Sequence, residues 1–170
     1  MIYLKKFLVS FVIYFFSYLN ASANENIVFI DLDLLLKKSE FGKSILMDLN
    51  NQKNNDLEML KSKNEKLKLK EKEIKKKTNI LKAEDLKKEI DLLKKDIIDF
   101  KNYKANVQKK FENNRKNQII SFFKTVNPII KSYVNENSIQ LVINKKNVFM
   151  GNKNLDITDS IINKINKEIK

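Results

Sequence analysis

Two closely spaced pairs of aspartates are the side chains whose type and spacing best suit chemistry. Asp31 and Asp33 lie near one end of the chain, and Asp156 and Asp159 lie near the other, with Thr158 between the second pair. Paired carboxylates can act as general acid and general base, and a threonine hydroxyl can act as a nucleophile. Nothing else near them in the sequence points to catalysis. Helix capping and turn formation are therefore the favoured roles for these side chains.

The amino-acid composition excludes several kinds of active site. The 170 residues include no cysteine and no histidine. Their absence rules out thiolate chemistry, histidine-assisted nucleophiles and the ordinary zinc and iron–sulfur centres. Calcium or magnesium sites built from oxygen ligands stay open. We predict that the protein is not an enzyme and uses no catalytic residue, cofactor or metal.

The chain is strongly basic and poor in residues that interrupt helices. Its formal net charge is +13. Such a surplus attracts nucleic acid, lipid phosphates or acidic polypeptides without choosing among them. The sequence holds only two glycines and one proline, and so few breakers favour long uninterrupted helices.

The first 23 residues have the pattern of a secretory signal peptide. Lys5 and Lys6 precede an apolar core, Phe7–Leu19, and Ala21–Ala23 forms a small-residue cleavage site. We predict cleavage near Ala23 and export of the remaining chain, whose net charge would be +11. An uncleaved membrane anchor is disfavoured, because the apolar run is shorter than the roughly 18–20 residues that span a bilayer.

Residues 43–127 are predicted to form an arm of two antiparallel helices. In the first helix Leu60, Leu67 and Ile74 recur every seven residues. The partner positions between them are polar, so only half of this heptad seam is apolar. The turn between the helices is expected near Asn79–Asp85.

The second helix carries a fuller apolar seam. Its 4-3 spacing is typical of a helix packed along its length against another helix. Pro128 is expected to kink or break it. The seam consists of Leu86, Ile90, Leu93, Ile97, Phe100, Val107 and Phe111.

The segments flanking the arm, residues 24–42 and 128–170, are predicted to form a small β-rich body. Ile27–Ile30 predicts a strand, followed by one or two helical turns that the segment Ser39–Gly42, which contains one of the two glycines, separates from the arm. Ile139–Ile143 and Val148–Met150 predict a β-hairpin, and a final helix follows.

The early strand can pair with the late hairpin in a three-stranded sheet. Such a sheet is marginal by itself, and association of several chains through it would bury its edges. The residues expected in this oligomerisation region are Ile27, Phe29, Leu141, Ile143, Val148 and Met150.

Three parts of the sequence resemble the Skp/OmpH family. The segment from Ile27 to Lys43 has that family's apolar strand, aspartate, apolar turn and Gly-Lys step. Pro128-Ile129 is similar to the family's Pro-Ile step near the base of its second arm helix. The last part, with Asp156-Ile157-Thr158-Asp159 at the start of a helix, is the most specific match.

The resemblance implies a mostly helical α+β fold and a jellyfish-shaped homotrimer. Three helical arms would hang from a shared β-rich body around a cavity. Family members hold unfolded outer-membrane proteins in that cavity while these cross the periplasm, without using a nucleotide. The resemblance therefore predicts an ATP-independent holding chaperone in the periplasm.

Two sets of arm residues are candidates for contact with such clients or with a membrane. The first set is favoured to pack within the arm, and the second set is favoured to be a solvated group of charges. The first set is the seam segment Ile90, Leu93, Ile97, Phe100, Val107 and Phe111. The second is the basic tip, which comprises Lys75, Lys76, Lys77, Lys87 and Lys88. In the alternative interpretation this tip contacts an anionic membrane.

Two other functions compete with the chaperone hypothesis. A structural coiled coil that links envelope layers would need the arm but no sheet. A non-specific basic protein that binds nucleic acid or lipid would fit the charge. The leader argues against a nucleic-acid partner, because it directs the chain away from the cytoplasm. The arms also offer few arginines and aromatic side chains for stacking on bases, so no nucleic-acid partner is predicted.

Overall fold

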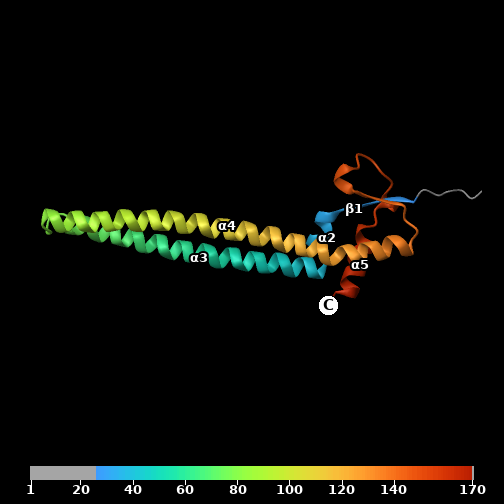
Figure 1. Ribbon diagram of the computed structural model, residues 1–170, viewed down its shortest axis with the longest axis horizontal. Helices are drawn as coiled ribbons and strands as arrows, with labels where there is room; N and C mark the ends of the chain where they lie inside the picture. The colour runs from blue at the N-terminus through green and yellow to red at the C-terminus, as the bar shows by residue number, and fades with distance from the viewer. Residues whose placement is uncertain (1–25, 170) are drawn as a thin grey trace, which may run out of the picture.

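A computed structural model describes residues 26–169 and shows a long two-helix arm projecting from a small body (Figure 1). The predicted leader, residues 1–23, lies outside this range. The fold is α+β and mostly helical, as predicted. In chain order the elements are β1 (Ile27–Ile30), α2 (Leu32–Lys38), α3 (Glu40–Lys77), α4 (Ala83–Glu136), β2 (Leu141–Asn144), the 3-10 turns η1 (Lys145–Asn147) and η2 (Lys153–Leu155), and α5 (Thr158–Glu168).

The chain passes from β1 through α2 into the arm by means of two capped corners. Asp31 caps α2, because its carboxylate accepts a hydrogen bond from the backbone N–H of Leu34 at 3.0 Å. Ser39 ends α2 and caps α3, with its hydroxyl oxygen 3.1 Å from the backbone nitrogen of Gly42. The predicted short helix and the capping role of Asp31 are both confirmed.

The break predicted within Ser39–Gly42 occurs at Ser39, the first residue of that segment. Gly42 lies inside the first turn of α3 and is buried. A Cβ atom at this position would lie 2.7 Å from the carbonyl carbon and 2.9 Å from the Cα of Leu36. Glycine is therefore needed for the close approach of α2 to α3, and Ser39 makes the break.

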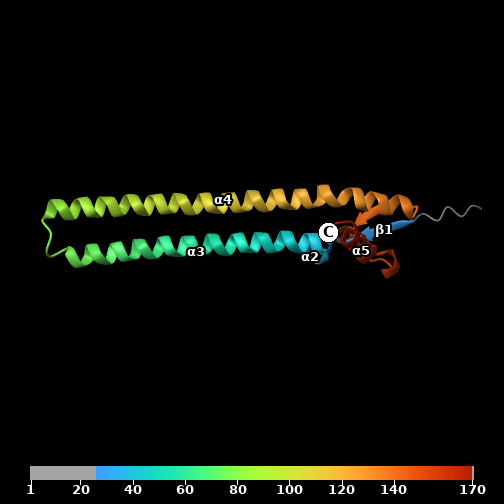
Figure 2. The same ribbon diagram turned by 90° about the horizontal axis from the view of Figure 1, so that it is seen from below.

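Helices α3 and α4 form the predicted hairpin and run side by side for most of their length (Figure 2). Their connection spans residues 78–82, which overlaps the predicted turn. A break at Pro128 is not observed, since α4 continues from Ala83 to Glu136. Phe122, Val126 and Ile129 are all buried against the body. This packing holds the helix together across a residue that cannot donate a backbone hydrogen bond.

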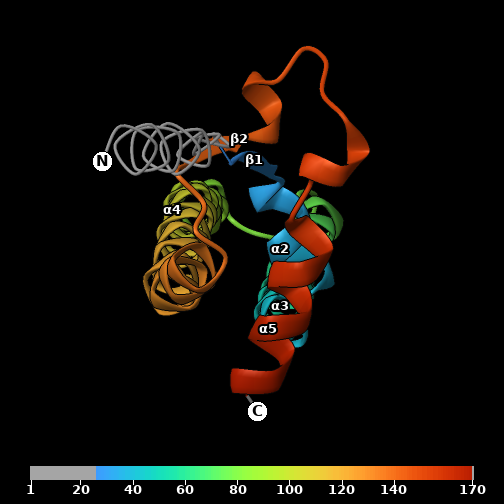
Figure 3. The ribbon, with the colours of Figure 1, turned by 90° about the vertical axis from the view of Figure 1, so that its right-hand side faces the viewer.

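The predicted β-hairpin does not form. β2 pairs with β1 in parallel, with Ile27 opposite Leu141 and Phe29 opposite Ile143. Val148–Met150 is not a strand within residues 26–169, because η1 follows β2 directly and turns the chain outward. The resulting loop stands out from the sheet in the view along the arm (Figure 3).

β1 lies between β2 and the segment that leads into α5. The backbone N–H of Ile157 donates a hydrogen bond to the carbonyl of Phe29 at 3.0 Å. Val28 and Ile30 point to the opposite face of β1 from Phe29 and are buried, 5% and 3% exposed. The core beneath them joins α2, the body ends of α3 and α4, and α5. Its other members are Leu35, Ile45, Leu49, Phe122, Val126, Ile129, Ile139, Ile157, Ile161, Ile162 and Ile165.

Thr158 ties the two ends of the described chain together. Its side chain is 2% exposed, and its hydroxyl oxygen accepts a hydrogen bond from the backbone N–H of Asp31 at 2.9 Å. The carboxylate of Asp156 accepts hydrogen bonds from both the hydroxyl and the backbone N–H of Thr158. The N-cap residue of α5 is Ile157, and no side chain forms the predicted cap there. Asp156 instead accepts the N–H of Thr158 from just before the helix, and Thr158 serves as an acceptor for β1.

Replacing Thr158 with valine is expected to lower the free energy of unfolding by about 1–3 kcal/mol, because the Asp31 N–H loses its acceptor in a partly buried place. Urea unfolding followed by circular dichroism at fixed protein concentration measures the loss. Serine at position 158 keeps the hydroxyl and should retain most of the stability. Thr125→Val, at an exposed position of α4, is the control. An equal loss of stability in Thr158→Val and Thr125→Val would contradict the proposed role of the Thr158 hydroxyl in holding β1.

Candidate binding surfaces

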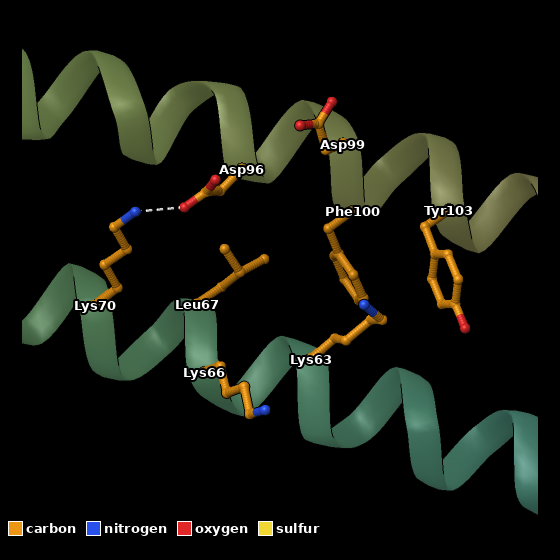
Figure 4. A pocket seen from close by; sticks show the side chains of 8 residues that line it. All are labelled: Lys63, Lys66, Leu67, Lys70, Asp96, Asp99, Phe100 and Tyr103. Atoms are coloured by element: carbon orange, nitrogen blue, oxygen red, sulfur yellow. Dashed lines mark hydrogen bonds and ion pairs between the residues drawn. The ribbon is translucent and has the colours of Figure 1, made fainter.

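An open groove of about 390 Å³ lies between the arm helices, in the half of the arm nearer the turn (Figure 4). Leu67 and Phe100 supply its apolar part, and charged side chains surround them. The lining residues are Lys63, Lys66, Leu67 and Lys70 of α3 and Asp96, Asp99, Phe100 and Tyr103 of α4.

Three polar contacts cross the arm at intervals of seven residues. The Lys63 Nζ lies 4.6 Å from the centre of the Tyr103 ring. The Lys70–Asp96 ion pair is 2.5 Å long and the Lys77–Glu89 pair is 3.2 Å. In each pair the two residue numbers add up to 166, as they do for Gln52 and Asn114, whose side-chain amides are 2.6 Å apart. The two helices therefore keep one register over this whole length.

Alternating polar and apolar layers hold the arm together weakly. Both side chains of the Lys70–Asp96 pair are about two-fifths exposed, at 41% and 42%, and such pairs contribute about 0–1 kcal/mol each. The intervening apolar contacts are few, and Ile74 is the one α3 side chain beyond Leu49 that is buried in the arm. Packing in this arm is thin enough for its helices to bend or separate at low cost.

The structure divides the predicted seam of α4 into two groups. Leu93, Phe100, Val107 and Phe111 are partly buried. Ile90 and Ile97 are more exposed, at 37% and 50%. The positions just before them, Glu89 and Asp96, turn inward, because each forms an ion pair with a lysine of α3. A search for apolar spacing alone could not find these positions. The matching heptads Lys63, Lys70, Lys77 and Glu89, Asp96, Tyr103 were the available signal.

The predicted basic tip is exposed at the end of the arm, and ion pairs neutralise part of its charge. Lys75 binds Glu71 at 2.9 Å, Lys77 binds Glu89, and Lys88 lies 3.4 Å from Glu84. Within residues 26–169, Lys76 and Lys87 form no ion pair. The hydrogen bond from Lys75 lowers the pKa of Glu71.

The predicted oligomerisation residues lie on and beside one face of the sheet. Ile27 and Leu141 are 37% and 49% exposed, while Phe29 is buried. Ile143 and Val148 are partly buried. Met150 and its neighbour Phe149, which was not among the predicted residues, are 85% and 99% exposed at the tip of the loop. The result is an exposed apolar surface on the body.

Two lysines at the start of the loop fix it to the two ends of the described chain. Lys145 binds Asp156 and Lys146 binds Asp33, each at 2.7 Å. Burial acts to raise the pKa of Asp156, but hydrogen bonds from Lys145 and Thr158 outweigh it and hold that pKa below its ordinary value. The hydrogen bond from Lys146 lowers the pKa of Asp33 in the same way.

The aspartates first considered for chemistry do gather around this loop. Asp156 raises the pKa of Lys145, and Asp31 and Asp159 contribute to the same increase. Asp31, Asp33 and Asp156 each have a structural partner, as a cap or an ion pair. Within residues 26–169, no cluster of carboxylates is arranged to hold a metal ion. The arrangement serves to fasten the loop to the body.

Acid is expected to loosen this fastening. Because the pKa of Asp156 is lowered in the folded protein, its contribution to stability is present above the ordinary unfolded carboxyl pKa of about 4. That contribution is lost as the pH falls through the lower, folded value. Urea unfolding between pH 7 and pH 3 should show a fall in stability below about pH 4.

Asp156→Asn should lower stability at pH 7 and reduce the acid-dependent fall, because it removes the charge partner of Lys145. Asp99→Asn, in the arm groove, is the matched control and should leave both unchanged. If the acid-dependent loss of stability is as large in Asp156→Asn as in the wild type, Asp156 is not its source.

A family model decides the affiliation of the chain. The model for outer membrane proteins of the OmpH-like kind matches residues 26–165. The chain belongs to the OmpH-like family. The OmpH-like match covers β1, the whole arm, β2 and most of α5, so it includes both surfaces described above.

A solved structure has the same fold. It is described as an outer membrane chaperone (OmpH-like) from Caulobacter crescentus CB15, and the two structures superpose with a TM-score of 0.81. The match covers 87% of this chain and 88% of the other, at 16% sequence identity. Among curated proteins, none matches this OmpH-like chain. Across residues 26–169, every helix is too short or too polar to pass through a lipid bilayer.

Proposed function

We propose that this OmpH-like protein is an ATP-independent holding chaperone of the periplasm that keeps unfolded outer-membrane proteins soluble. It would act by binding alone, without a catalytic site. Membership of the family supports the chaperone role, and so does the likeness to a protein described as an outer membrane chaperone. The leader-like sequence of residues 1–23 supports export.

The observation that carries the proposal is the arm, which offers many small apolar contacts along its length. A holding chaperone must cover apolar segments of its client and then release them, so weak and distributed contacts suit it. The exposed large apolar side chains of the two arm helices are Met47, Leu57, Met59, Leu69, Ile90, Leu92, Ile97, Ile98 and Ile120.

The working form would be a homotrimer that joins through the body. Ile27 and Leu141 at the start of the two strands, and Phe149 and Met150 in the loop, are apolar and exposed in a single chain. Among residues 26–169, β1 is the one strand that pairs with β2, so the other edge of β2 is unpaired in this part of the chain. Neighbouring copies would cover both features, as sheet edges usually require.

Light scattering on residues 24–170, with and without a urea-unfolded β-barrel protein, tests the proposal. We expect the mass of a trimer, and a gain of one client mass when the diluted client is added. Turbidity of the client alone should rise on dilution and stay low in the presence of the trimer, without ATP. A monomer or dimer that leaves client aggregation unchanged would favour a structural coiled coil.

The double substitution Phe149→Ser and Met150→Ser is expected to dissociate the trimer, because it removes the most exposed apolar side chains of the body. Sedimentation velocity at micromolar concentration would show a shift toward monomer, with helical content unchanged. Ile80→Ser, at an 80% exposed position in the arm turn, is the control and should remain trimeric. Retention of the trimer in the double variant would exclude the loop tip as a contact.

A further inference from the structure

The arm has two long sides, and they differ in charge. The groove defines the first side, because Lys66 of α3 and Asp99 of α4 both line it. Residues two or five positions away from these are rotated by about 140–200° around their helix. They therefore lie on the opposite side of the arm. Because the register is constant, residues seven apart on either helix stay on the same side.

Lysines occupy this opposite side in two heptad rows, and we name it the lysine face. Two isoleucines, Ile90 and Ile97, lie between the rows and are 37% and 50% exposed. All the lysines of the face are exposed. The rows are Lys61, Lys68 and Lys75 on α3 and Lys87, Lys94 and Lys101 on α4, and Lys104 follows Ile97 by seven residues on the line between them.

Little negative charge balances the lysine face. Lys75 pairs with Glu71 at 2.9 Å and Lys94 pairs with Asp91 at 3.3 Å. Within residues 26–169, the other five lysines of the face form no ion pair. On the groove side, by contrast, Lys70 is paired with Asp96. Within residues 26–169 the groove side also has lysines without an ion pair, such as Lys66, but Asp99 lines the groove beside them. The lysine face therefore carries the larger excess of positive charge.

We propose that the lysine face binds extended polypeptide segments that are both acidic and apolar. The inference rests on the proposed chaperone function and names the part of the client that this side of the arm selects. Charge complementarity favours acidic segments. The apolar line of Ile90 and Ile97 is one side chain wide, which fits an extended chain.

The shape and composition of the lysine face fit other anionic partners less well. A lipid surface selects helices with a broad apolar face, and here the apolar line is narrow with lysines on both sides. Single-stranded nucleic acid is held by aromatic stacking. Between Lys61 and Lys104 the two aromatic side chains, Phe100 and Tyr103, line the groove instead.

A pair of matched triple variants tests the inference. The first replaces Lys87, Lys94 and Lys101 of the lysine face with glutamine. The second replaces Lys88, Lys95 and Lys109, which lie on the groove side of the same helix. Both remove three positive charges, and glutamine has nearly the helix propensity of lysine. Circular dichroism should show equal helical content.

Two protein probes are used with each variant, and vesicles that contain anionic lipid are a third probe. The first is a fluorescent 12-residue peptide of alternating aspartate and leucine, whose binding is followed by anisotropy. The second is a urea-unfolded outer-membrane β-barrel protein. We expect the lysine-face variant to bind the peptide about tenfold more weakly than the wild type, and the groove-side variant to change by less than about twofold. Raising the salt concentration should reduce the difference, because these charges are exposed to solvent.

Each outcome bears on the lysine face. Equal weakening in both variants would show that total charge matters and would overturn the inference, as would no weakening in either. If binding to anionic-lipid vesicles depends on the lysine face and binding of the peptide does not, the face would be assigned to contact with a membrane. If the wild type fails to hold the unfolded β-barrel but binds the peptide through the lysine face, the chaperone proposal falls and the inference stands.

Discussion

Replacing Phe122 with alanine is expected to cost about 3–5 kcal/mol of unfolding free energy, the range for loss of a fully buried aromatic side chain. Phe122 is 0% exposed. Its ring stacks on Phe41 at a centroid distance of 5.7 Å and meets the edge of Phe123 at 5.2 Å. These contacts join the body end of α3 to α4. The variant should therefore lose the body and leave the arm without its attachment.

Urea unfolding followed by circular dichroism, at fixed protein concentration, measures the effect of Phe122→Ala. Phe122→Leu keeps most of the volume and should lose clearly less. Leu92→Ala, at a 55% exposed position of the arm, removes an apolar side chain from water and should change stability little. A loss in Phe122→Ala no larger than that in Leu92→Ala would show that this part of the core is not needed.

Gly42→Ala is expected to cost about 2–3 kcal/mol, although alanine favours a helix over glycine by about 1 kcal/mol. The added Cβ would lie 2.7 Å from the carbonyl carbon of Leu36. That atom belongs to the backbone, so α2 would have to move away from α3. Thermal unfolding should show a lower midpoint together with weaker protection of α2 amides in hydrogen exchange.

Gly151→Ala is the matched control for Gly42→Ala. There the nearest atom to an added Cβ is the Cε1 of the Phe29 ring, at 2.9 Å. A side chain can shift where a backbone cannot, so the cost should be smaller. If both substitutions lower the midpoint equally, the close approach of α2 and α3 is not the reason for Gly42.

The helical arm and its turn could be predicted from the sequence because local patterns determine them. The heptads on each helix, the scarcity of glycine and proline, and the charged outer positions all indicate the same hairpin. The final helix was equally clear, and Ile161, Ile162 and Ile165 are buried on the face that their spacing predicts.

The errors arose where distant segments meet. Val148–Met150 has the residues of a strand, but Lys145 and Lys146 are fastened to Asp156 and Asp33 and draw this segment into a loop. Pro128 sits in an unbroken helix because tertiary packing outweighs its local cost. Ile90 and Ile97 are more exposed than predicted, because the preceding Glu89 and Asp96 turn inward to form ion pairs across the arm. None of these contacts can be recognised from one segment alone.

The place of β1 in the sheet has a consequence for the order of folding. β1 is held on one side by β2 and on the other by Ile157, so its neighbours are synthesised more than a hundred residues later. The arm hairpin needs only local contacts and can form while the chain is still emerging. Val28 and Ile30 stay exposed to water until the C-terminal segment packs against them. A chain that ends early would thus carry a finished arm on an open body, with an unpaired strand available to other unfinished chains.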